Sequence, residues 1–189
     1  GKGTFLVVGR PLVKGDWPLL WRRVGIVFQY SADQLFCPSC WEEVAFGPQQ
    51  LGLSPGEVER RVQKALAVVQ LEGFDKRVPL HMSGGERKRL AIAATLSLQP
   101  EILILDEPTA SLDPKSEEQL MAVLEALPMA KLLITHDLFF IRRLCSRTIV
   151  LHQGRIIRDY KTEAFLADKQ LRTINGLDNI NKSNWLAEI

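Results

Sequence analysis

The sequence has no apolar run long enough to cross a bilayer, and we expect no signal peptide. Its most apolar stretch covers only residues 90–98, whereas a membrane-spanning helix needs about 20 residues. The first residues lead directly into a strand-like pattern, without the charged and then apolar regions of a signal peptide. We therefore expect any role at a membrane to depend on a partner protein.

The sequence also lacks a strong excess of one charge. Its 189 residues include 24 Lys and Arg and 22 Asp and Glu, which gives a formal net charge of +2. The densest basic cluster, Arg87–Arg89, falls in a helical pattern, and we expect it to lie on a solvated helix face. Because nucleic-acid-binding domains generally carry a basic stripe, we expect no nucleic-acid partner.

Cysteine is scarce, with three residues in the chain. An odd number of cysteines cannot pair completely, which is typical of a protein from a reducing compartment. Cys37 and Cys40 form a C-x-x-C pattern, but no second such pair follows and the histidines lack ligand spacing. We therefore expect neither a functional thiol pair nor a metal site at these cysteines.

The last third of the chain alternates short apolar runs with helical patterns. Short continuous apolar runs are typical of strands buried on both faces, and their alternation with helices is typical of a parallel sheet. We expect strands at 102–105, 132–135 and 148–152, separated by helices at about 115–127 and 137–145. These segments predict an α/β fold with a helix-covered parallel sheet.

The remaining pattern predicts further strands and two well-delimited helices. One helix starts at the capping box Ser54-Pro55-Gly56-Glu57, and the other ends before Pro100. From Tyr160 onward the pattern is too weak to assign. The expected elements are a strand at 4–8, a turn at 9–11, a strand at 24–28, a helix from about 54 that ends near Gly73, a helix at about 84–98, and an edge strand at 155–157.

Polar side chains directly follow three of the expected strands. These residues are Gln29, the pair Asp106 and Glu107, and His136. Ligands of open α/β sheets bind at the carboxyl ends of the strands, so we predict a site for metal-assisted hydrolysis there. Neighbouring residues on an extended backbone point in different directions. This suits separate tasks, in which Asp106 holds Mg²⁺ and Glu107 orients or deprotonates a water molecule.

Residues 83–86 read S-G-G-E at the predicted start of a helix. Ser83 and Glu86 have the spacing of a capping box. Glycine costs about 1 kcal/mol in a helix interior, but Gly84 and Gly85 would leave backbone N–H groups open to close approach by an anion. We therefore predict that this helix start contacts a phosphate.

Five motifs, in order along the chain, resemble those of the ABC-type ATPases. MSGGE (82–86) resembles their signature motif, and ILILDEP (102–108) resembles their Walker B strand with its catalytic glutamate. The other similar segments are VGIVFQ (24–29) before the Q-loop glutamine, SLD (111–113) at the D-loop and LLITHD (132–137) at the H-switch. Residues 27–58 further resemble the importer ATPases of the cobalt/nickel and energy-coupling-factor group.

This resemblance implies an α/β fold of the P-loop NTPase type with an inserted helical lobe. Residues 1–29 and 99–158 would form a partial ATPase core. Residues 30–98 would form the helical lobe that carries the signature motif, and residues 159–189 would be a C-terminal tail.

The resemblance also implies ATP and Mg²⁺ as ligands and a role for each site residue. Asp106 and Gln29 would lie at the metal, Glu107 would polarise water, and His136 would stabilise the γ-phosphate. The remaining nucleotide contacts would come from Ser83, Gly84, Gly85, Glu86 and Asp113. The residues of the S-G-G-E segment would lie against ATP held by an opposite subunit, and Asp113 would couple the two sites.

Two kinds of partner follow from the same resemblance. A second ABC ATPase subunit, identical or paralogous, would pair head to tail with this chain around two ATP molecules. An integral membrane subunit would contact the region of Gln34–Trp41. The protein would then act at the cytoplasmic face of a membrane and power import of a metal ion or a vitamin-like substrate.

The phosphate-binding loop of such ATPases is incomplete in this sequence. A Walker A loop reads G-x-x-x-x-G-K-[ST] and opens a helix, but Lys2 is followed by Gly3 and a strand pattern. Lys2 also stands too close to Gln29 for a helix and the intervening strands. We expect GKGT to lead into a strand and turn that come after the loop and its helix. The alternative is that GKGT joins two parts of the chain that are separated by a disordered segment.

Two other functions fit the sequence less well. A degenerate subunit that only lends S-G-G-E to a competent partner could lose both Glu107 and His136, yet both are present. An ABC ATPase of DNA repair or chromosome maintenance would carry a long coiled coil between Gln29 and Ser83. A compact stretch without heptads joins these two residues instead.

Overall fold

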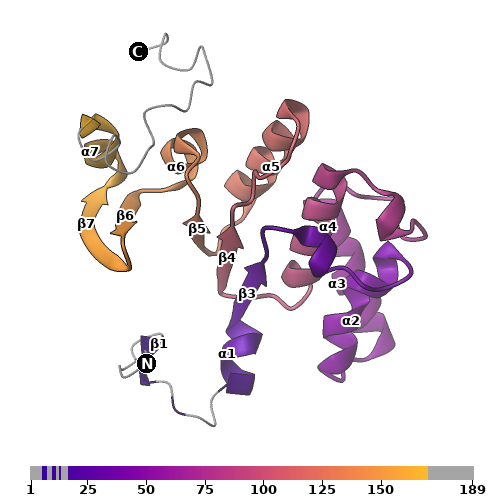
Figure 1. Cartoon of the computed structure of the whole chain (residues 1–189). Coiled ribbons are helices and arrows are strands. Elements are labelled where there is room, and N and C mark those ends of the chain that lie inside the picture. Colours follow the sequence, from indigo (N-terminus) through magenta and orange to yellow (C-terminus); the bar gives the residue numbers. More distant parts are fainter. Residues whose placement is uncertain (1–5, 8–9, 12, 14–16, 170–189) are drawn as a thin grey trace. The chain divides into compact units, whose positions relative to one another are not determined.

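The computed structural model describes residues 6–7, 10–11, 13 and 17–169, and the chain divides into two units (Figure 1). Unit 1 is Gly1–Ile134 and unit 2 is Thr135–Ile189. The interpretation of GKGT falls outside the described residues, as does most of the predicted tail. The domain ranges expected from the sequence stay a prediction.

A three-stranded parallel sheet in unit 1 has the order β3–β4–β5 (Figure 1). Its strands are β3 (Val24–Val27), β4 (Ile102–Asp106) and β5 (Ala130–Ile134). The central strand β4 pairs in parallel with both neighbours. The parallel sheet and its three strands were expected from the sequence, and the structure confirms them.

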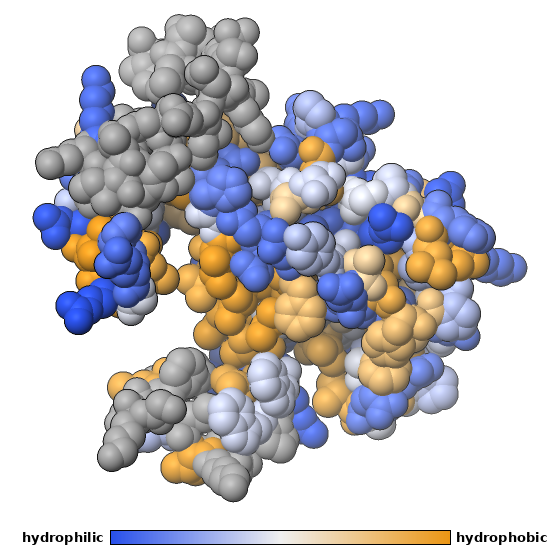
Figure 2. Space-filling view, in the orientation of Figure 1, coloured by the Kyte–Doolittle hydropathy of each residue, from blue (hydrophilic) through white to orange (hydrophobic). Residues whose placement is uncertain are grey.

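The sheet buries one face more completely than the other. Val27, Leu103 and Leu105 are fully buried. The residues that alternate with them along β3 and β4 are half-buried. On β5, Leu132 and Ile134 are 51% and 50% exposed, and Figure 2 shows apolar surface over the region of the sheet. The expectation that the strand at 102–105 is buried on both faces was therefore correct for one face only, because Leu103 and Leu105 are fully buried whereas Ile102 and Ile104 are half-buried. Successive side chains of a strand point to opposite faces, and the packed helices bury one face more than the other.

Three helices of unit 1 pack against one another: α2 (Cys40–Gln50), α3 (Pro55–Val68) and α4 (Gly84–Leu96) (Figure 1). Each begins after a serine whose hydroxyl accepts a hydrogen bond from the backbone N–H of a glutamate three residues later. This N-cap satisfies a backbone donor that the helix itself leaves free. The pairs are Ser39 with Glu42, Ser54 with Glu57, and Ser83 with Glu86. The two helices expected in this region are confirmed as α3 and α4.

The other elements of unit 1 are shorter, apart from one helix. They are β1 (Leu6–Val7), β2 (Arg10–Pro11), α1 (Trp17–Arg23), the 3-10 turns η1 (Ser31–Asp33) and η2 (Pro79–His81), and α5 (Pro114–Ala126). The expected turn at 9–11 is wrong in part, because Arg10–Pro11 forms a strand that pairs antiparallel with β1. Val7 lies opposite Arg10, so the chain has already reversed when it reaches Arg10.

Unit 2 is built on an antiparallel hairpin. Its elements are α6 (Leu138–Leu144), β6 (Arg147–His152), β7 (Arg155–Lys161) and α7 (Thr162–Ala167). A small core of Ile141, Val150 and Phe165 holds the two helices to the hairpin. The expected edge strand after Gly154 is confirmed, and α7 forms in the segment that the sequence pattern left unassigned.

The hairpin corrects one expectation about the sheet. The strand at 148–152 was expected to continue the parallel sheet, but its partner in the described structure is β7. Gln153 and Gly154 both have positive φ, 47° and 74°, as in the tight two-residue turns that join antiparallel strands. Because this turn is so tight, β6 pairs with β7, the next strand along the chain. Among the described helices, none combines the length and apolar content needed to cross a membrane.

Candidate functional site

The start of α4 carries a complete capping box. Ser83 Oγ accepts a hydrogen bond from the Glu86 backbone N–H at 3.2 Å, and the Glu86 carboxylate accepts one from the Ser83 N–H at 2.8 Å. The bond from the Ser83 backbone is the main reason why the pKa of Glu86 is lowered. Glu86 thus has a structural task at the helix start, and its nucleotide contact stays a prediction.

The two glycines of this turn differ in their surroundings. Gly85 is buried, and a Cβ atom there would lie only 2.3 Å from Ser116 Oγ of α5. Gly84 is exposed, and a Cβ atom there would meet only Ser111 O, at 3.9 Å. Close packing against α5 therefore explains Gly85, whereas Gly84 leaves the N–H end of the helix accessible to an anion.

Asp113 begins α5, next to the contact with Gly85. Its carboxylate accepts hydrogen bonds from the Ser116 hydroxyl at 2.6 Å and from the Ser116 N–H at 3.0 Å. These bonds, the hydroxyl first, lower the pKa of Asp113. Ser116 therefore joins the predicted segments 83–86 and 111–113, and this residue was not predicted from the sequence. Its one signal was the spacing of three residues after Asp113, which is typical of an N-cap.

Asp106 and Glu107 lie at the carboxyl end of the central strand. Asp106 is the last residue of β4 and pairs with Ile134 of β5. At Glu107 the backbone φ is +39°, a left-handed conformation that is uncommon for a residue with a side chain. The Glu107 N–H donates to Ile134 O at 2.8 Å, so the chain turns sharply as it leaves the sheet. Strained backbone of this kind is concentrated at functional sites.

Gln29 leaves the sheet at the same edge. Val27 of β3 pairs with Leu105 of β4, so Gln29 and Glu107 each stand two residues beyond that pair. Parallel pairing therefore brings together the backbone of two predicted site segments. This part of the predicted convergence is present in unit 1.

Two side chains hold the backbone that follows β3. The Gln34 amide accepts from the Phe28 N–H and donates to Ile26 O, both at 3.1 Å. From the other side, Lys88 Nζ of α4 donates to Phe28 O at 3.0 Å and to Gln29 O at 2.7 Å. The position of Gln29 is thus set by a residue far along the chain.

The expectation that the basic cluster lies on a solvated helix face was wrong. Lys88 is 2% exposed and Arg89 is 6% exposed, while Arg87 is half-buried. The helix α4 is covered by α2, α3, α5 and β3, so its basic side chains reach polar atoms of these neighbours. Arg89 donates to Gln119 of α5 at 2.6 Å. The burial of Lys88 was the second feature missed from the sequence.

His136 belongs to unit 2 and lies two residues after the end of β5, which is the last strand of unit 1. The next residue, Asp137, caps α6 by accepting hydrogen bonds from the N–H groups of Phe139 and Phe140. The place of His136 beside Glu107 stays a prediction, because it concerns residues of two separate units.

The C-x-x-C cysteines are free thiols. Burial, as the largest cause, raises the pKa of both Cys37 and Cys40 to about 11. The Cys40 thiol is buried and donates to Met82 Sδ at 3.4 Å. Both thiols are therefore protonated at neutral pH, the form that neither attacks an electrophile nor binds a metal readily.

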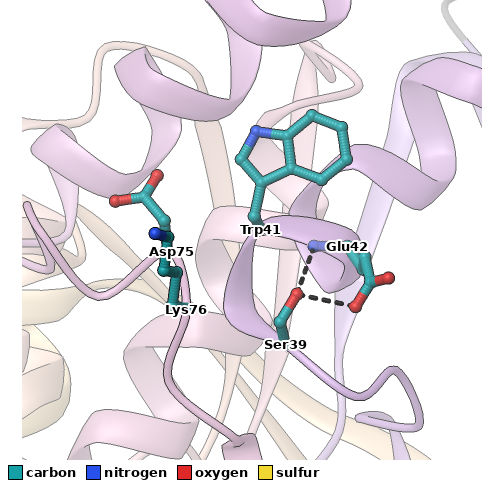
Figure 3. A pocket seen from close by; sticks show the side chains of 5 residues that line it. All are labelled: Ser39, Trp41, Glu42, Asp75 and Lys76. Atoms are coloured by element: carbon teal, nitrogen blue, oxygen red, sulfur yellow. Dashed lines mark hydrogen bonds between the residues drawn. The ribbon is translucent and has the colours of Figure 1, made fainter.

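A surface hollow of about 430 Å³ lies beside the start of α2. Its lining consists of Ser39, Trp41, Glu42, Asp75 and Lys76 (Figure 3). The Trp41 indole N–H donates to Glu59 at 2.8 Å, which fixes the ring against α3. Figure 3 also shows Ser39 joined to Glu42, whose carboxylate accepts from the serine hydroxyl at 2.7 Å.

Comparison with known proteins identifies clear relatives. A family model described as "ABC transporter" matches residues 1–110. A putative ABC transporter ATP-binding protein from Streptomyces avermitilis is 44% identical over 94% of this chain and 68% of its own length. An energy-coupling factor transporter ATP-binding protein, EcfA, from Methanocaldococcus jannaschii is 41% identical over 88% of this chain and 62% of its own length.

One solved structure is similar over most of the described fold. It is CbiO1 from Clostridium perfringens, described as part of the ABC transporter complex CbiONQ. The TM-score is 0.79 at 31% sequence identity, and the match covers 92% of this chain and 72% of CbiO1.

Replacing Gly85 by alanine should destabilise the protein, whereas the same change at Gly84 should not. In Gly85→Ala the Ser116 side chain must shift, so we expect the free energy of unfolding to fall by about 1–3 kcal/mol, the usual cost of overpacking. In Gly84→Ala the methyl group has room, and the change should stay within about 0.5 kcal/mol. Urea unfolding of the two variants measures both values, and equal losses would contradict this distinction.

Alkylation should report the raised pKa of Cys37. With a pKa of about 11, only about one thiol in a thousand is the reactive thiolate at pH 8. Labelling with iodoacetamide, followed at the peptide by mass spectrometry, should therefore accelerate about tenfold per pH unit from pH 8 to 10. The urea-unfolded protein is the control and should react much faster at pH 8. A plateau below pH 9 in the folded protein would show that its thiol is not protected.

Proposed function

Since this chain belongs to the ABC transporter family and is an ATPase subunit of it, we propose that it powers an importer for a metal ion or a vitamin-like substrate. The observation that carries the proposal is the strained turn at Glu107, which leaves the parallel sheet at the same edge as Gln29. The similarity to EcfA and CbiO1 supports the importer class.

Glu107 is the proposed catalytic residue. Its carboxylate orients a water molecule and takes a proton from it as the water oxygen bonds to the γ-phosphorus of ATP. The bond between that phosphorus and the bridging oxygen breaks, which releases ADP and phosphate. His136, which follows β5 in the sequence, would stabilise the negative charge of the γ-phosphate.

Asp106 and the Gln29 amide are the residues that would hold Mg²⁺. This ion is usually bound through one or two carboxylates together with substrate phosphates and water, so a single carboxylate at a strand end fits it. The described residues contain no group of three His, Cys, Asp or Glu arranged for a metal, and Mg²⁺ bound in this way needs none. When bound, the ion neutralises phosphate charge.

The start of α4 is the proposed phosphate contact for the ATP of a second subunit. Gly84 is exposed and without a Cβ, at a helix end where N–H groups are directed outward. Ser83 and the Gly85 N–H belong to the same turn, and Glu86 supports the turn through the capping box. Two copies, or this chain and a paralogue, would pair head to tail around two ATP molecules.

Asp113 would couple the two sites of this dimer. It is exposed, and its carboxylate is held by Ser116, which also packs on Gly85. A shift of the Asp113 loop therefore displaces the turn that contacts phosphate. A degenerate subunit that only lends S-G-G-E is the alternative, but it would have no use for a carboxylate on the strained backbone turn at Glu107.

The membrane subunit would dock on the region of Gln34–Trp41, which places the protein at the cytoplasmic face of a membrane. Phe36 is 68% exposed and packs edge to face on Phe46, with ring centroids 5.0 Å apart. Exposed aromatic side chains are typical anchors of protein interfaces. At the other end of the segment, Ser39 and Trp41 line the hollow beside the start of α2.

The change Glu107→Gln in the full-length protein should slow ATP hydrolysis by about 100-fold or more, because an amide cannot accept the proton. ATP binding should persist, so this variant should accumulate as an ATP-bound dimer. Phosphate release measures the rate, and light scattering with and without ATP measures the dimer. The control is Glu118→Gln, at an exposed position of α5, which should hydrolyse like the wild type.

An unchanged rate in Glu107→Gln would contradict the role of this carboxylate. A full-length wild type that binds ATP without hydrolysing it would instead favour the degenerate subunit.

The change Phe36→Ala should weaken binding of the membrane subunit. Loss of a buried aromatic anchor at an interface commonly costs 2 kcal/mol or more, so we expect affinity to fall by about 30-fold. Binding to the detergent-solubilised membrane subunit can be measured by surface plasmon resonance. The control is Ile156→Ala, which removes an equally exposed apolar side chain from the hairpin of unit 2. Equal affinities of both variants would place the docking surface elsewhere.

A further inference from the structure

Lys88 occupies an unusual position for a lysine. It lies in the second turn of α4, is 2% exposed, and is among the largest fully buried side chains of the described residues. Its ammonium donates to two backbone carbonyls, Phe28 O at 3.0 Å and Gln29 O at 2.7 Å. A lysine is almost never fully buried unless its charge is satisfied, so this arrangement requires a reason.

The two carbonyls belong to the point where the chain leaves the sheet. β3 ends at Val27, so the carbonyls of residues 28 and 29 have no strand partner there. Carbonyls withdrawn even in part from water need donors, and Lys88 donates to both of these part-buried carbonyls from a helix about 60 residues further along the chain. On the other side, Gln34 holds residues 26 and 28. The segment is therefore fixed from two directions.

Among the residues that the structure describes, no carboxylate forms a salt bridge with Lys88. Burial lowers its pKa, and the nearby carboxylate of Asp106 opposes this shift. Its hydrogen bonds go to neutral carbonyls. Because hydrogen bonds are directional, these two hold the ammonium group at one place. Lys88 thus acts as a tether of defined geometry and not as a mobile counter-ion.

The same helix carries the proposed phosphate contact. Lys88 follows Gly84 by four residues, which is about 6 Å along a helix axis. An α-helix is rigid over one turn, so a displacement of the Gln29 backbone would be passed through the Lys88 hydrogen bonds to the start of α4. Ser83 and Gly84 lie at that start.

We propose that Lys88 is a positioning residue that ties the Gln29 segment to α4, so that movement of one is transmitted to the phosphate-contacting turn of the other. The proposal rests on the function proposed above for Gln29 and Ser83–Gly85. It extends that function by naming the link inside one subunit between the segment that would hold Mg²⁺ and the turn that would face the second ATP.

The test compares Lys88→Met, Lys88→Arg and the control Lys64→Met in the full-length protein. Methionine keeps the length and apolar body of the side chain but donates no hydrogen bond, whereas arginine can donate to both carbonyls. Lys64 lies on an exposed position of α3, so its change removes a positive charge without touching the Gln29 segment. Hydrogen exchange followed by mass spectrometry reports the backbone, and steady-state kinetics report kcat and KM for ATP.

In Lys88→Met the amides of residues 28–34 should exchange about tenfold faster or more, because charged hydrogen bonds that hold this backbone are lost. Exchange in α3 and in β4 should stay as in the wild type. The value of kcat should fall about tenfold, with KM for ATP changed by less than about threefold, since Lys88 does not contact the nucleotide. Lys88→Arg should restore most of the slow exchange at residues 28–34 and most of kcat. Lys64→Met should behave like the wild type.

Two results would overturn the proposal. One is wild-type exchange at residues 28–34 in Lys88→Met. The other is faster exchange throughout unit 1 without recovery in Lys88→Arg, which is the result of general destabilisation. If the wild type fails to hydrolyse ATP, the proposed function fails, and hydrogen exchange at residues 28–34 still decides whether Lys88 holds this segment.

Discussion

Parallel pairing of β4 with both β3 and β5 is the constraint on which the candidate site depends. Because the three strands run in the same direction, the residues that follow them leave the sheet at one edge. Gln29 and Glu107 stand in the same register beyond the pair of Val27 and Leu105. A shift of one residue in this register would turn every side chain of a strand to the other face. The fully buried Val27, Leu103 and Leu105 hold the register in place.

The helix α4 adds the second half of the site. It is covered on most sides, so its polar side chains must find partners in neighbouring elements. Lys88 reaches the backbone that follows β3, and Arg89 reaches α5. At its start, Gly85 permits Ser116 of α5 to approach closely. One buried helix therefore connects the carboxyl edge of the sheet to the exposed turn at Ser83 and Gly84.

Many of the strands and helix starts could be predicted from local sequence patterns. Short apolar runs marked β3, β4 and β5, and the spacing of serine and glutamate marked the starts of α3 and α4. These signals are strong because helix caps and strand patterns depend on residues within a few positions of one another. The hairpin of unit 2 was predicted only in part. Its strands were expected, but the tight turn at residues 153–154, which selects the antiparallel partner of β6, outweighed the alternating pattern.

The sequence by itself determined the order of the elements, the ATPase motifs and the residues that follow each strand, because these are properties of neighbouring positions. Tertiary structure alone decided which of two adjacent glycines is exposed, and that a cluster of basic residues is buried. The physical reason is that burial is set by distant segments. Ser116 lies 31 positions beyond Gly85, and Gln29 lies 59 positions before Lys88. No local pattern carries the information that these residues meet.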